Sequence, residues 1–187
     1  MENQYSGWRR WLSPWNLATI AILLWLAPRL LPHLGAVVGV ESGGRRSPSY
    51  EVATLTGEAL SPAELRGKVV LVNFWATWCG PCRMEMPALQ AMYERHRGEG
   101  LVLLGLSVDR GGEQVVRDYV RERGVTYPVA IVGPTVEAAF GGVRGYPTSF
   151  LLDRGGVVRH EVIGPLAPAT LELAVRRLLD EPAPNAR

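Results

Sequence analysis

Cysteine is scarce in this sequence. Its 187 residues include only two, Cys79 and Cys82, and a disulfide between them would close a short loop that stabilises a fold by roughly 2 kcal/mol. Small secreted domains use several such bridges because their cores are too small to be stable alone. A chain of this length has enough residues for one self-sufficient domain plus an appendage. The pair therefore points to chemistry rather than to a structural crosslink.

A surplus of charge is also missing. Lysine and arginine number 20 against 18 aspartates and glutamates, which gives a net charge of +2. Residues 1–47 hold five arginines and two acidic residues, a surplus of +3, so the remaining residues carry a net charge of −1. This body lacks the basic stripe of a nucleic-acid-binding protein. Internal repeats and the G-x-G-x-x-G pattern of nucleotide-binding loops are absent as well. We therefore expect no nucleic-acid partner.

No uninterrupted apolar run is long enough to cross a membrane. The cleanest run, residues 17–27, has 11 residues, about 16 Å as a helix, whereas the hydrocarbon core of a bilayer is about 30 Å thick. Extension to residue 34 or 40 supplies the length if Arg29 and the prolines lie near an interface. Residues 15–40 are therefore a transmembrane anchor, a cleaved signal peptide or a buried helix, and the lack of an Ala-x-Ala site favours the anchor.

Charge does not orient this segment, because two arginines flank it on each side: Arg9, Arg10, Arg45 and Arg46. Residues 1–14 are the N-terminal tail in this interpretation. Residues 41–49, ESGGRRSPS, have the composition of a linker. A domain is expected over residues 50–180, followed by a flexible tail at 181–187.

The domain sequence alternates apolar runs with helical patterns. Short runs rich in β-branched and aromatic residues predict buried strands over residues 69–75, 101–108 and 149–152, and a turn at Gly155-Gly156 leads to a further strand over 157–163. Helical periodicity appears over residues 79–97, 113–123, 136–140 and 168–179. This alternation predicts an α/β domain with a central, mostly parallel sheet and helices on both faces.

The two cysteines stand where a strand meets a helix. Unpaired N–H groups and the dipole at a helix N-terminus stabilise an anion, so the Cys79 thiol should have a pKa below its ordinary value of about 8.5. Cys79 is then the nucleophile, and Cys82, three residues on, can resolve a mixed disulfide. The other interpretation is a zinc half-site. A complete zinc site would need a second cysteine pair or suitably placed histidines. The sequence has no second pair, and its three histidines, His33, His96 and His160, are not spaced as zinc ligands usually are.

Two motifs together resemble the thioredoxin superfamily, and more narrowly its TlpA/ResA branch of exported, membrane-anchored thiol-disulfide oxidoreductases. They are residues 74–82, FWATWCGPC, and residues 145–153, GYPTSFLLD. The resemblance covers roughly residues 48–180. It implies a thioredoxin-like fold located in the periplasm or at the cell exterior, on a single-pass membrane segment or secreted after signal cleavage.

The resemblance also assigns roles to single residues. It implies that Pro147 is a cis-proline packed on the disulfide and that Glu85 is the acid that accepts the Cys82 proton, although spacing alone equally allows Glu85 to be a solvated helix residue. Asn73 stands where thioredoxin has a buried aspartate. The expected substrate-binding residues are Trp78, Gly80, Pro81, Tyr146 and Pro147.

The predicted reaction is dithiol-disulfide exchange at a redox-active disulfide, Cys79–Cys82, with no other cofactor and no metal. Gly-Pro between the cysteines resembles the reducing members of the fold. The expected protein is a reductase of disulfides in exported proteins, recharged by a membrane electron donor, with apocytochrome c as one substrate candidate. Three alternatives stay open: a disulfide oxidase or isomerase, a peroxiredoxin-like peroxidase, and a copper-binding module that recruits His160. The P-x-x-x-T-x-x-C pattern that surrounds the reactive cysteine of peroxiredoxins is absent from this sequence.

Overall fold

The computed structural model describes Thr19, Ile22 and residues 44–183. Contacts divide the chain into two units, Met1–Val40 and Glu41–Arg187. The predicted tail at 1–14 and the predicted anchor at 15–40 fall in the first unit and lie outside the described residues, apart from Thr19 and Ile22. Within the described part of the chain, no helix combines the length and the apolar character that crossing a membrane requires.

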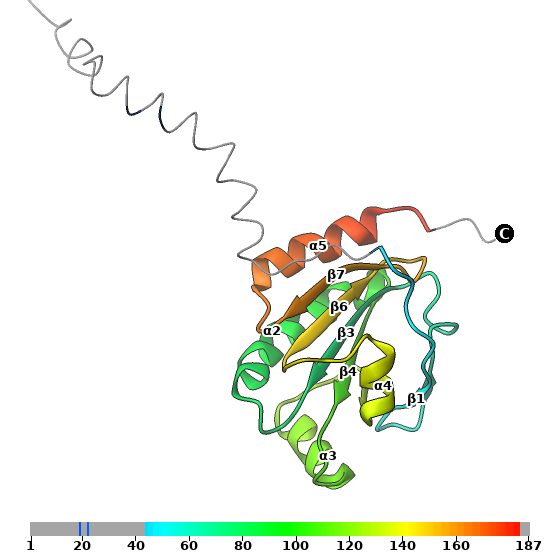
Figure 1. The fold of residues 1–187 in the computed structure, drawn as a ribbon, viewed down its shortest axis with the longest axis vertical. Coiled ribbons are helices and arrows are strands. Elements are labelled where there is room, and N and C mark those ends of the chain that lie inside the picture. The colour runs from blue at the N-terminus through cyan, green and yellow to red at the C-terminus, as the bar shows by residue number, and fades with distance from the viewer. Residues whose placement is uncertain (1–18, 20–21, 23–43, 184–187) are drawn as a thin grey trace, which may run out of the picture. The chain divides into compact units, whose positions relative to one another are not determined.

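The second unit is built around a five-stranded sheet of order β5-β4-β3-β6-β7 (Figure 1). Its strands are β3 (Val69–Trp75), β4 (Leu101–Ser107), β5 (Val129–Ile131), β6 (Thr148–Leu152) and β7 (Val158–Ile163). Every residue of the central strand β3 is buried, as expected of an apolar run covered on both faces. The four predicted strands are confirmed to within one residue at each end, whereas the three-residue β5 was not predicted.

The sheet is mixed rather than mostly parallel. Strand β4 pairs in parallel with both β3 and β5, whereas β6 pairs antiparallel with both β3 and β7. The prediction of a mostly parallel sheet is therefore wrong. The difference arises in the connection after β5, which passes through the six-residue helix α4 (Pro134–Ala139) and does not return the chain to the opposite end of the sheet. The chain consequently re-enters the sheet from the end at which β5 finished.

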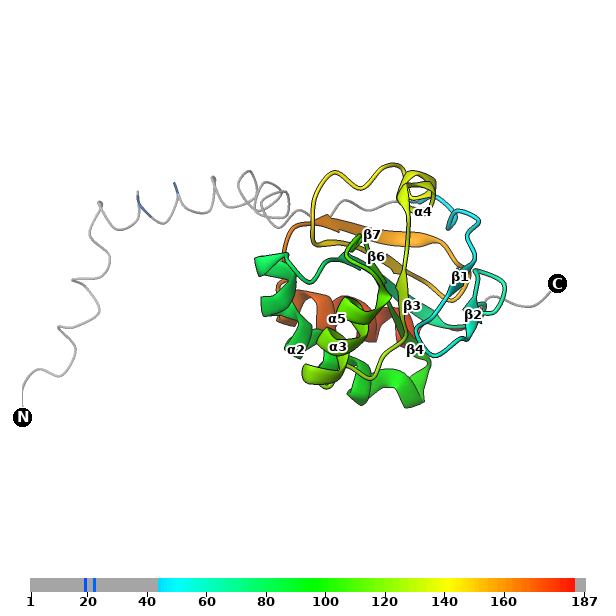
Figure 2. The same ribbon diagram turned by 90° about the horizontal axis from the view of Figure 1, so that it is seen from below.

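Helices cover both faces of the sheet, as predicted (Figure 2). On one face lie α2 (Gly80–His96), α3 (Glu113–Glu122) and α5 (Pro168–Asp180), with a 3-10 turn, η2 (Arg97–Glu99), after α2. Trp75 meets Tyr119 of α3 on this face, with ring centroids 5.6 Å apart. On the other face Phe74 meets Phe140, the residue after α4, at 5.2 Å. Successive residues of β3 thus point to opposite helical layers.

Close packing explains one glycine of the sheet. A Cβ at Gly105 in β4 would lie 3.1 Å from both Trp75 Nε1 and Tyr127 Cε2, closer than packed side chains normally approach. Trp75 itself is fully buried, which agrees with its expected role in the core. A small hairpin of β1 (Val52–Ala53) and β2 (Ala59–Leu60) adds to the sheet through a single bridge from Thr54 to Ala130.

The second half of the predicted linker belongs to the folded domain. Residue 46 bridges to Val157 beside β7, and the Ser47 amide donates to the Gly156 carbonyl at 2.7 Å. The guanidinium of Arg45 donates to the Phe140 carbonyl at 2.8 Å. At the other end Glu181, the first residue of the predicted flexible tail, accepts from Arg159 at 2.9 Å. Composition does not show such long-range contacts.

Candidate active site

The candidate site lies where β3 runs into α2. Cys79 and Cys82 form a disulfide there, with their Cα atoms 5.3 Å apart. Cys79 is the N-cap of α2 and has an extended backbone conformation, and its sulfur accepts the Cys82 amide at 3.2 Å. The predicted position of the pair, at a strand-to-helix junction, is therefore confirmed. A thiolate formed at Cys79 on reduction would lie at the positive end of a 17-residue helix.

The two residues that separate the cysteines occupy the first turn of α2. Gly80 opens the helix and Pro81 follows within its first turn, where the missing proline N–H has no helical partner to lose. Both residues are exposed. Of the two cysteines Cys79 is the more accessible, with 5% of its surface exposed against 1% for Cys82. An incoming substrate would therefore reach the Cys79 sulfur first.

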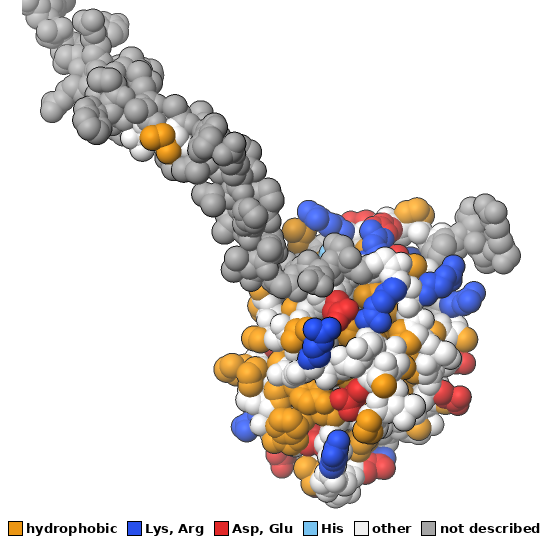
Figure 3. Space-filling view, in the orientation of Figure 1, with side chains coloured by type: hydrophobic (Ala, Val, Ile, Leu, Met, Phe, Trp, Pro, Cys, Tyr) orange, Lys and Arg blue, Asp and Glu red, His pale blue; other side chains and the backbone are white. Residues whose placement is uncertain are grey.

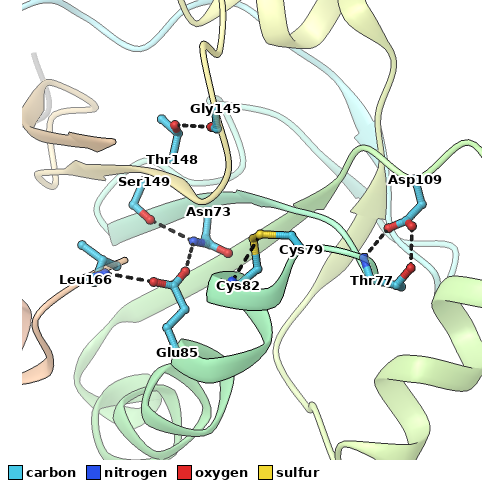
Figure 4. Close-up of a disulfide and its surroundings, with 10 residues drawn as sticks. All are labelled: Asn73, Thr77, Cys79, Cys82, Glu85, Asp109, Gly145, Thr148, Ser149 and Leu166. Atoms are coloured by element: carbon cyan, nitrogen blue, oxygen red, sulfur yellow. Dashed lines mark hydrogen bonds between the residues drawn. A yellow bond between two sulfur atoms is a disulfide. The ribbon is translucent and has the colours of Figure 1, made fainter. Parts of the chain in front are cut away.

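Glu85 lies inside the protein, one helical turn after Cys82. Only 6% of its surface is exposed. One carboxylate oxygen accepts from the Asn73 amide at 2.9 Å and the other from the Leu166 backbone amide at 3.0 Å (Figure 4). Burial raises the pKa of Glu85 above its ordinary value, against the opposing effect of these two hydrogen bonds. Glu85 is thus a buried acid next to the cysteine pair, not a solvated helix residue.

Asn73 on β3 connects this acid to the sheet. Its side-chain amide donates to Glu85 and also to the Ser149 hydroxyl, at 2.9 Å each. Both N–H groups are therefore used, and the residue is 2% exposed. An amide cannot take up a proton in the physiological range. Glu85 is accordingly the titratable residue of this buried network, and Asn73 holds its carboxylate by a hydrogen bond.

Aromatic and proline residues form one wall of the site. The rings of Trp78 and Tyr146 meet edge to face, with centroids 5.9 Å apart. The peptide bond between Tyr146 and Pro147 is cis, as predicted. Thr148 holds this loop closed through a 2.7 Å hydrogen bond from its hydroxyl to the Gly145 carbonyl. The substrate-binding residues expected from the resemblance are therefore gathered around one disulfide.

A second polar network lies on the other side of the disulfide. Both the amide and the hydroxyl of Thr77 donate to Asp109, at 2.9 and 2.6 Å (Figure 4). The Ser107 hydroxyl donates to the same carboxylate at 2.8 Å. Asp109 is 8% exposed. This network fixes the loop that carries Cys79 and was not found from the sequence, where only the position of Asp109 directly after a buried strand marks it.

The structure offers the copper hypothesis no set of ligands. Over residues 44–183, Thr19 and Ile22, no three side chains of histidine, cysteine, aspartate or glutamate come close enough to share a metal ion. His160 lies on β7 opposite Leu151. Burial lowers its pKa, and the charges of Arg159 and Arg177 lower it further. The cysteine pair with Glu85 beside it therefore remains the candidate site of the described chain.

Known proteins that resemble this chain include thiol-disulfide oxidoreductases. A model of the AhpC/TSA family matches residues 44–161. The thiol-disulfide oxidoreductase ResA of Bacillus thuringiensis (strain Al Hakam) is 34% identical over 136 residues, which cover 72% of this chain and 78% of ResA. The thioredoxin-like protein YneN of Bacillus subtilis (strain 168) is 33% identical, with coverage of 72% and 79%.

Solved structures show the same relationship. A thiol:disulfide interchange protein of the thioredoxin family from Chlorobium tepidum TLS superposes with a TM-score of 0.67 and 33% identity. The match covers 74% of this chain and 99% of that protein. The likeness therefore extends over most of this chain and nearly all of that protein.

Proposed function

The chain belongs to the AhpC/TSA family and is a TlpA/ResA-like thiol-disulfide oxidoreductase of the thioredoxin superfamily, and from this we propose that it reduces disulfides in exported proteins. The proposed location is outside the cytoplasm, on a single-pass anchor at residues 15–40 or secreted after its cleavage. One candidate substrate is apocytochrome c, whose disulfide would be reduced during the maturation of c-type cytochromes. The observation that carries the proposal is the disulfide at the N-terminus of α2 with the buried acid Glu85 beside it.

The proposed reaction begins with the reduced dithiol. The Cys79 thiolate attacks one sulfur of the substrate disulfide, so a mixed disulfide forms and one substrate thiol leaves with a proton. Cys82 then gives its proton to Glu85 and attacks the Cys79 sulfur. The second substrate thiol leaves, and the Cys79–Cys82 disulfide forms. Two electrons thus pass from the cysteine pair to the substrate, and a membrane dithiol donor restores the pair.

The surroundings suit each of these steps. The Cys82 amide that bonds the Cys79 sulfur at 3.2 Å also favours the thiolate during attack. Trp78 and Tyr146 give the substrate an apolar contact beside the sulfur. The raised pKa of Glu85 brings it nearer to that of the thiol, which a proton acceptor needs in order to give the proton up again.

Capture of mixed disulfides tests this proposal. Expression of the Cys82→Ser variant in the native host should leave substrates covalently bound to Cys79, because no thiol resolves the intermediate. Diagonal electrophoresis and mass spectrometry would identify them, and we expect exported proteins, among them chains with a CXXCH segment. The matched control is Cys79→Ser, which should capture little, since Cys82 is 1% exposed. Capture of cytoplasmic proteins alone, or equal capture by both variants, would contradict the proposal.

The direction of electron flow has its own measurement. Redox potentials within this fold run from about −270 mV for reductants to about −120 mV for oxidants. Titration of the full chain against glutathione or dithiothreitol should place the Cys79–Cys82 pair at the reducing end. A potential near the oxidising end would instead assign an oxidase or isomerase role.

A further inference from the structure

Four loops meet around the disulfide, and their surface describes the substrate that the proposed function would use. Residues 76–84 carry the disulfide itself. Residues 109–112 are attached to them through the Thr77–Asp109 hydrogen bonds, and residues 141–147 through the ring contact of Trp78 with Tyr146. These contacts define the first three parts of what we call the rim.

The fourth part of the rim is residues 163–167. The Gly164 amide donates to the Pro147 carbonyl at 2.7 Å, and the Leu166 amide donates to Glu85. Figure 4 shows labelled residues of all four loops around the two sulfurs. A polypeptide that presents a disulfide to Cys79 must therefore lie across this rim.

The rim is apolar next to the sulfurs. Trp78 is 66% exposed and Met84 is 74% exposed, and Ile163 at the end of β7 is 54% exposed. In Figure 3 hydrophobic side chains gather on the visible face at the end of the sheet where β3 leads into α2. Large exposed apolar side chains that gather at one place mark a contact surface for a partner.

The exposed charged side chains of the rim are all positive. Its three arginines, Arg83, Arg110 and Arg144, are exposed, and none of them has an ion pair with another described residue. The only acidic residue of the four loops is Asp109, which is 8% exposed and already accepts from Thr77 and Ser107.

Neighbouring carboxylates outside the four loops are engaged as well. Glu137 on α4 accepts the Tyr146 hydroxyl at 2.6 Å, and Glu113 at the start of α3 pairs with Arg117. Arg110 lies close enough to Tyr146 to oppose the rise of the phenol pKa, which burial and Glu137 take to about 12. The hydrogen-bond donors of Asp109 and Glu137 are uncharged, so these two carboxylates count against the three exposed arginines. The balance of charge around the disulfide is still positive, and the exposed part of it belongs to the arginines, although the domain as a whole is nearly neutral.

We propose that this oxidoreductase selects polypeptide disulfides flanked by acidic side chains, with an apolar residue that packs on Trp78 and Met84. The inference rests on the proposed reductase function and names its substrate class. Opposite charge across a contact surface raises the rate of productive encounter more than it raises affinity. An apocytochrome segment would fit the same rule only if acidic residues border its cysteines.

Three peptides test the preference. Each is cyclised by one disulfide, and the residues next to its cysteines are all glutamate, all glutamine or all lysine. The measurement is the second-order rate constant for reduction by the reduced full chain. At about 10 mM salt, where the Debye length is about 30 Å, we expect the glutamate peptide to react roughly tenfold faster than the lysine peptide. At about 1 M salt, where that length is about 3 Å, the ratio should approach one.

Variants assign the preference to the rim. Arg83→Gln, Arg110→Gln and Arg144→Gln should each lower the ratio of the glutamate to the lysine rate, and the triple variant should abolish it. The ratio of two peptides cancels any change in the reactivity of Cys79 itself. The matched control is Arg66→Gln, which removes the same charge from an exposed residue near the start of β3, about 20 Å from the disulfide end of that strand. It should leave the ratio unchanged.

The possible results distinguish a failure of the charge preference from a failure of the proposed reductase function. Equal rates for the glutamate and lysine peptides at low salt would overturn the charge preference and leave the reductase function intact. A preference that survives the triple variant, or that Arg66→Gln lowers equally, would also overturn it. If none of the three peptides were reduced, the proposed reductase function and this inference would fail together.

Discussion

In the proposed reaction, Glu85 accepts the Cys82 proton during the second step. Its carboxylate accepts two hydrogen bonds that favour the charged form, yet burial outweighs them and raises its pKa. A carboxyl with a raised pKa holds a proton more firmly than a solvated one, and it can therefore return that proton to a departing thiol. Substitution of the acid by an amide of equal size tests this step.

We expect Glu85→Gln to fold normally and to resolve the mixed disulfide more slowly. The slowing should be about tenfold at pH 7, below the 10²–10⁴ typical of general acid–base catalysis, because a few per cent of an ordinary thiol is already ionised at that pH. Stopped-flow measurement of disulfide exchange between pH 6 and 8 would show it, with the loss largest at low pH.

The control for this prediction is on the same helix. Glu94→Gln removes an exposed carboxylate that bonds only Gln90 among the described side chains, and its rate should equal that of the native chain. A Glu85→Gln rate that matches the native rate at every pH from 6 to 8 would remove the acid–base role of Glu85.

Some residues of the site could be predicted from neighbouring residues in the sequence, and others could not. Cys79, Cys82 and Glu85 lie within seven consecutive residues, so a short stretch of sequence together with the family resemblance is enough to predict them. Ser149 and Asp109 enter the site only because β6 and the end of β4 lie beside β3 in the folded sheet. Their contacts depend on strand pairing, which a single sequence does not reveal.

At the scale of elements, α2 is held to α5 by a half-buried cluster at the end remote from the disulfide. The His96 ring, 5% exposed, lies between Glu99 at 3.1 Å and Glu172 of α5 at 2.7 Å. Burial by itself would lower the pKa of His96, but its hydrogen bonds with the two carboxylates outweigh burial and raise that pKa. Despite its own burial, Glu172 has a pKa lowered to about 2 by Arg95, His96 and Arg176.

This cluster predicts how stability depends on pH. The raised pKa of His96 means that its contribution is complete below the ordinary value of 6.5 and is lost as pH rises through the folded-state pKa. The lowered pKa of Glu172 contributes above 4.5 and is lost as pH falls toward 2. The clamp between α2 and α5 is therefore strongest between about pH 4.5 and 6.5.

Urea unfolding of His96→Gln at two pH values measures this contribution. At pH 5.5 we expect the free energy of unfolding of the native chain to exceed that of the variant by about 1–2 kcal/mol, because the variant loses charge-assisted hydrogen bonds. At pH 8.5 the difference should be clearly smaller. Arg117→Gln is the control, since it breaks an exposed pair worth at most about 0.5 kcal/mol. A pH-independent difference for His96→Gln would contradict the prediction.

The elements also show what a sequence predicts about a fold and what it does not. β3 was predicted at its observed bounds because six of its seven positions are apolar or aromatic, which leaves one interpretation. The two-residue strands β1 and β2 and the three-residue β5 are too short for periodicity to detect. Strand direction was the larger error, because it depends on the reach of α4 and the loop after it rather than on the residues of β6.

At the scale of the whole molecule, Arg45 in the segment that enters the domain connects the sheet to the face that α4 covers. Arg45 donates to the carbonyl of Phe140 after α4 and to the carboxylate of Glu161 on β7, at 2.8 and 3.1 Å. Its guanidinium also lies over the Phe150 ring, 5.5 Å from the centroid. The contacts of Arg45 thus fix the position at which the chain enters the domain. The segment that carries Tyr146 begins directly after Phe140, whose carbonyl accepts from Arg45.

Adjacent arginines provide a matched pair to test this restraint. Arg45→Ala should lower the free energy of unfolding by about 1–2 kcal/mol, because it removes a charged hydrogen bond, a half-exposed ion pair and a cation–π contact that are not additive. Arg46→Ala removes the same charge from a side chain without a hydrogen bond or ion pair to the described residues, and should change stability by less than about 0.5 kcal/mol. Urea unfolding of the two variants compares them directly. Equal losses would mean that net charge, rather than the contacts of Arg45, stabilises the entry of the chain into the domain.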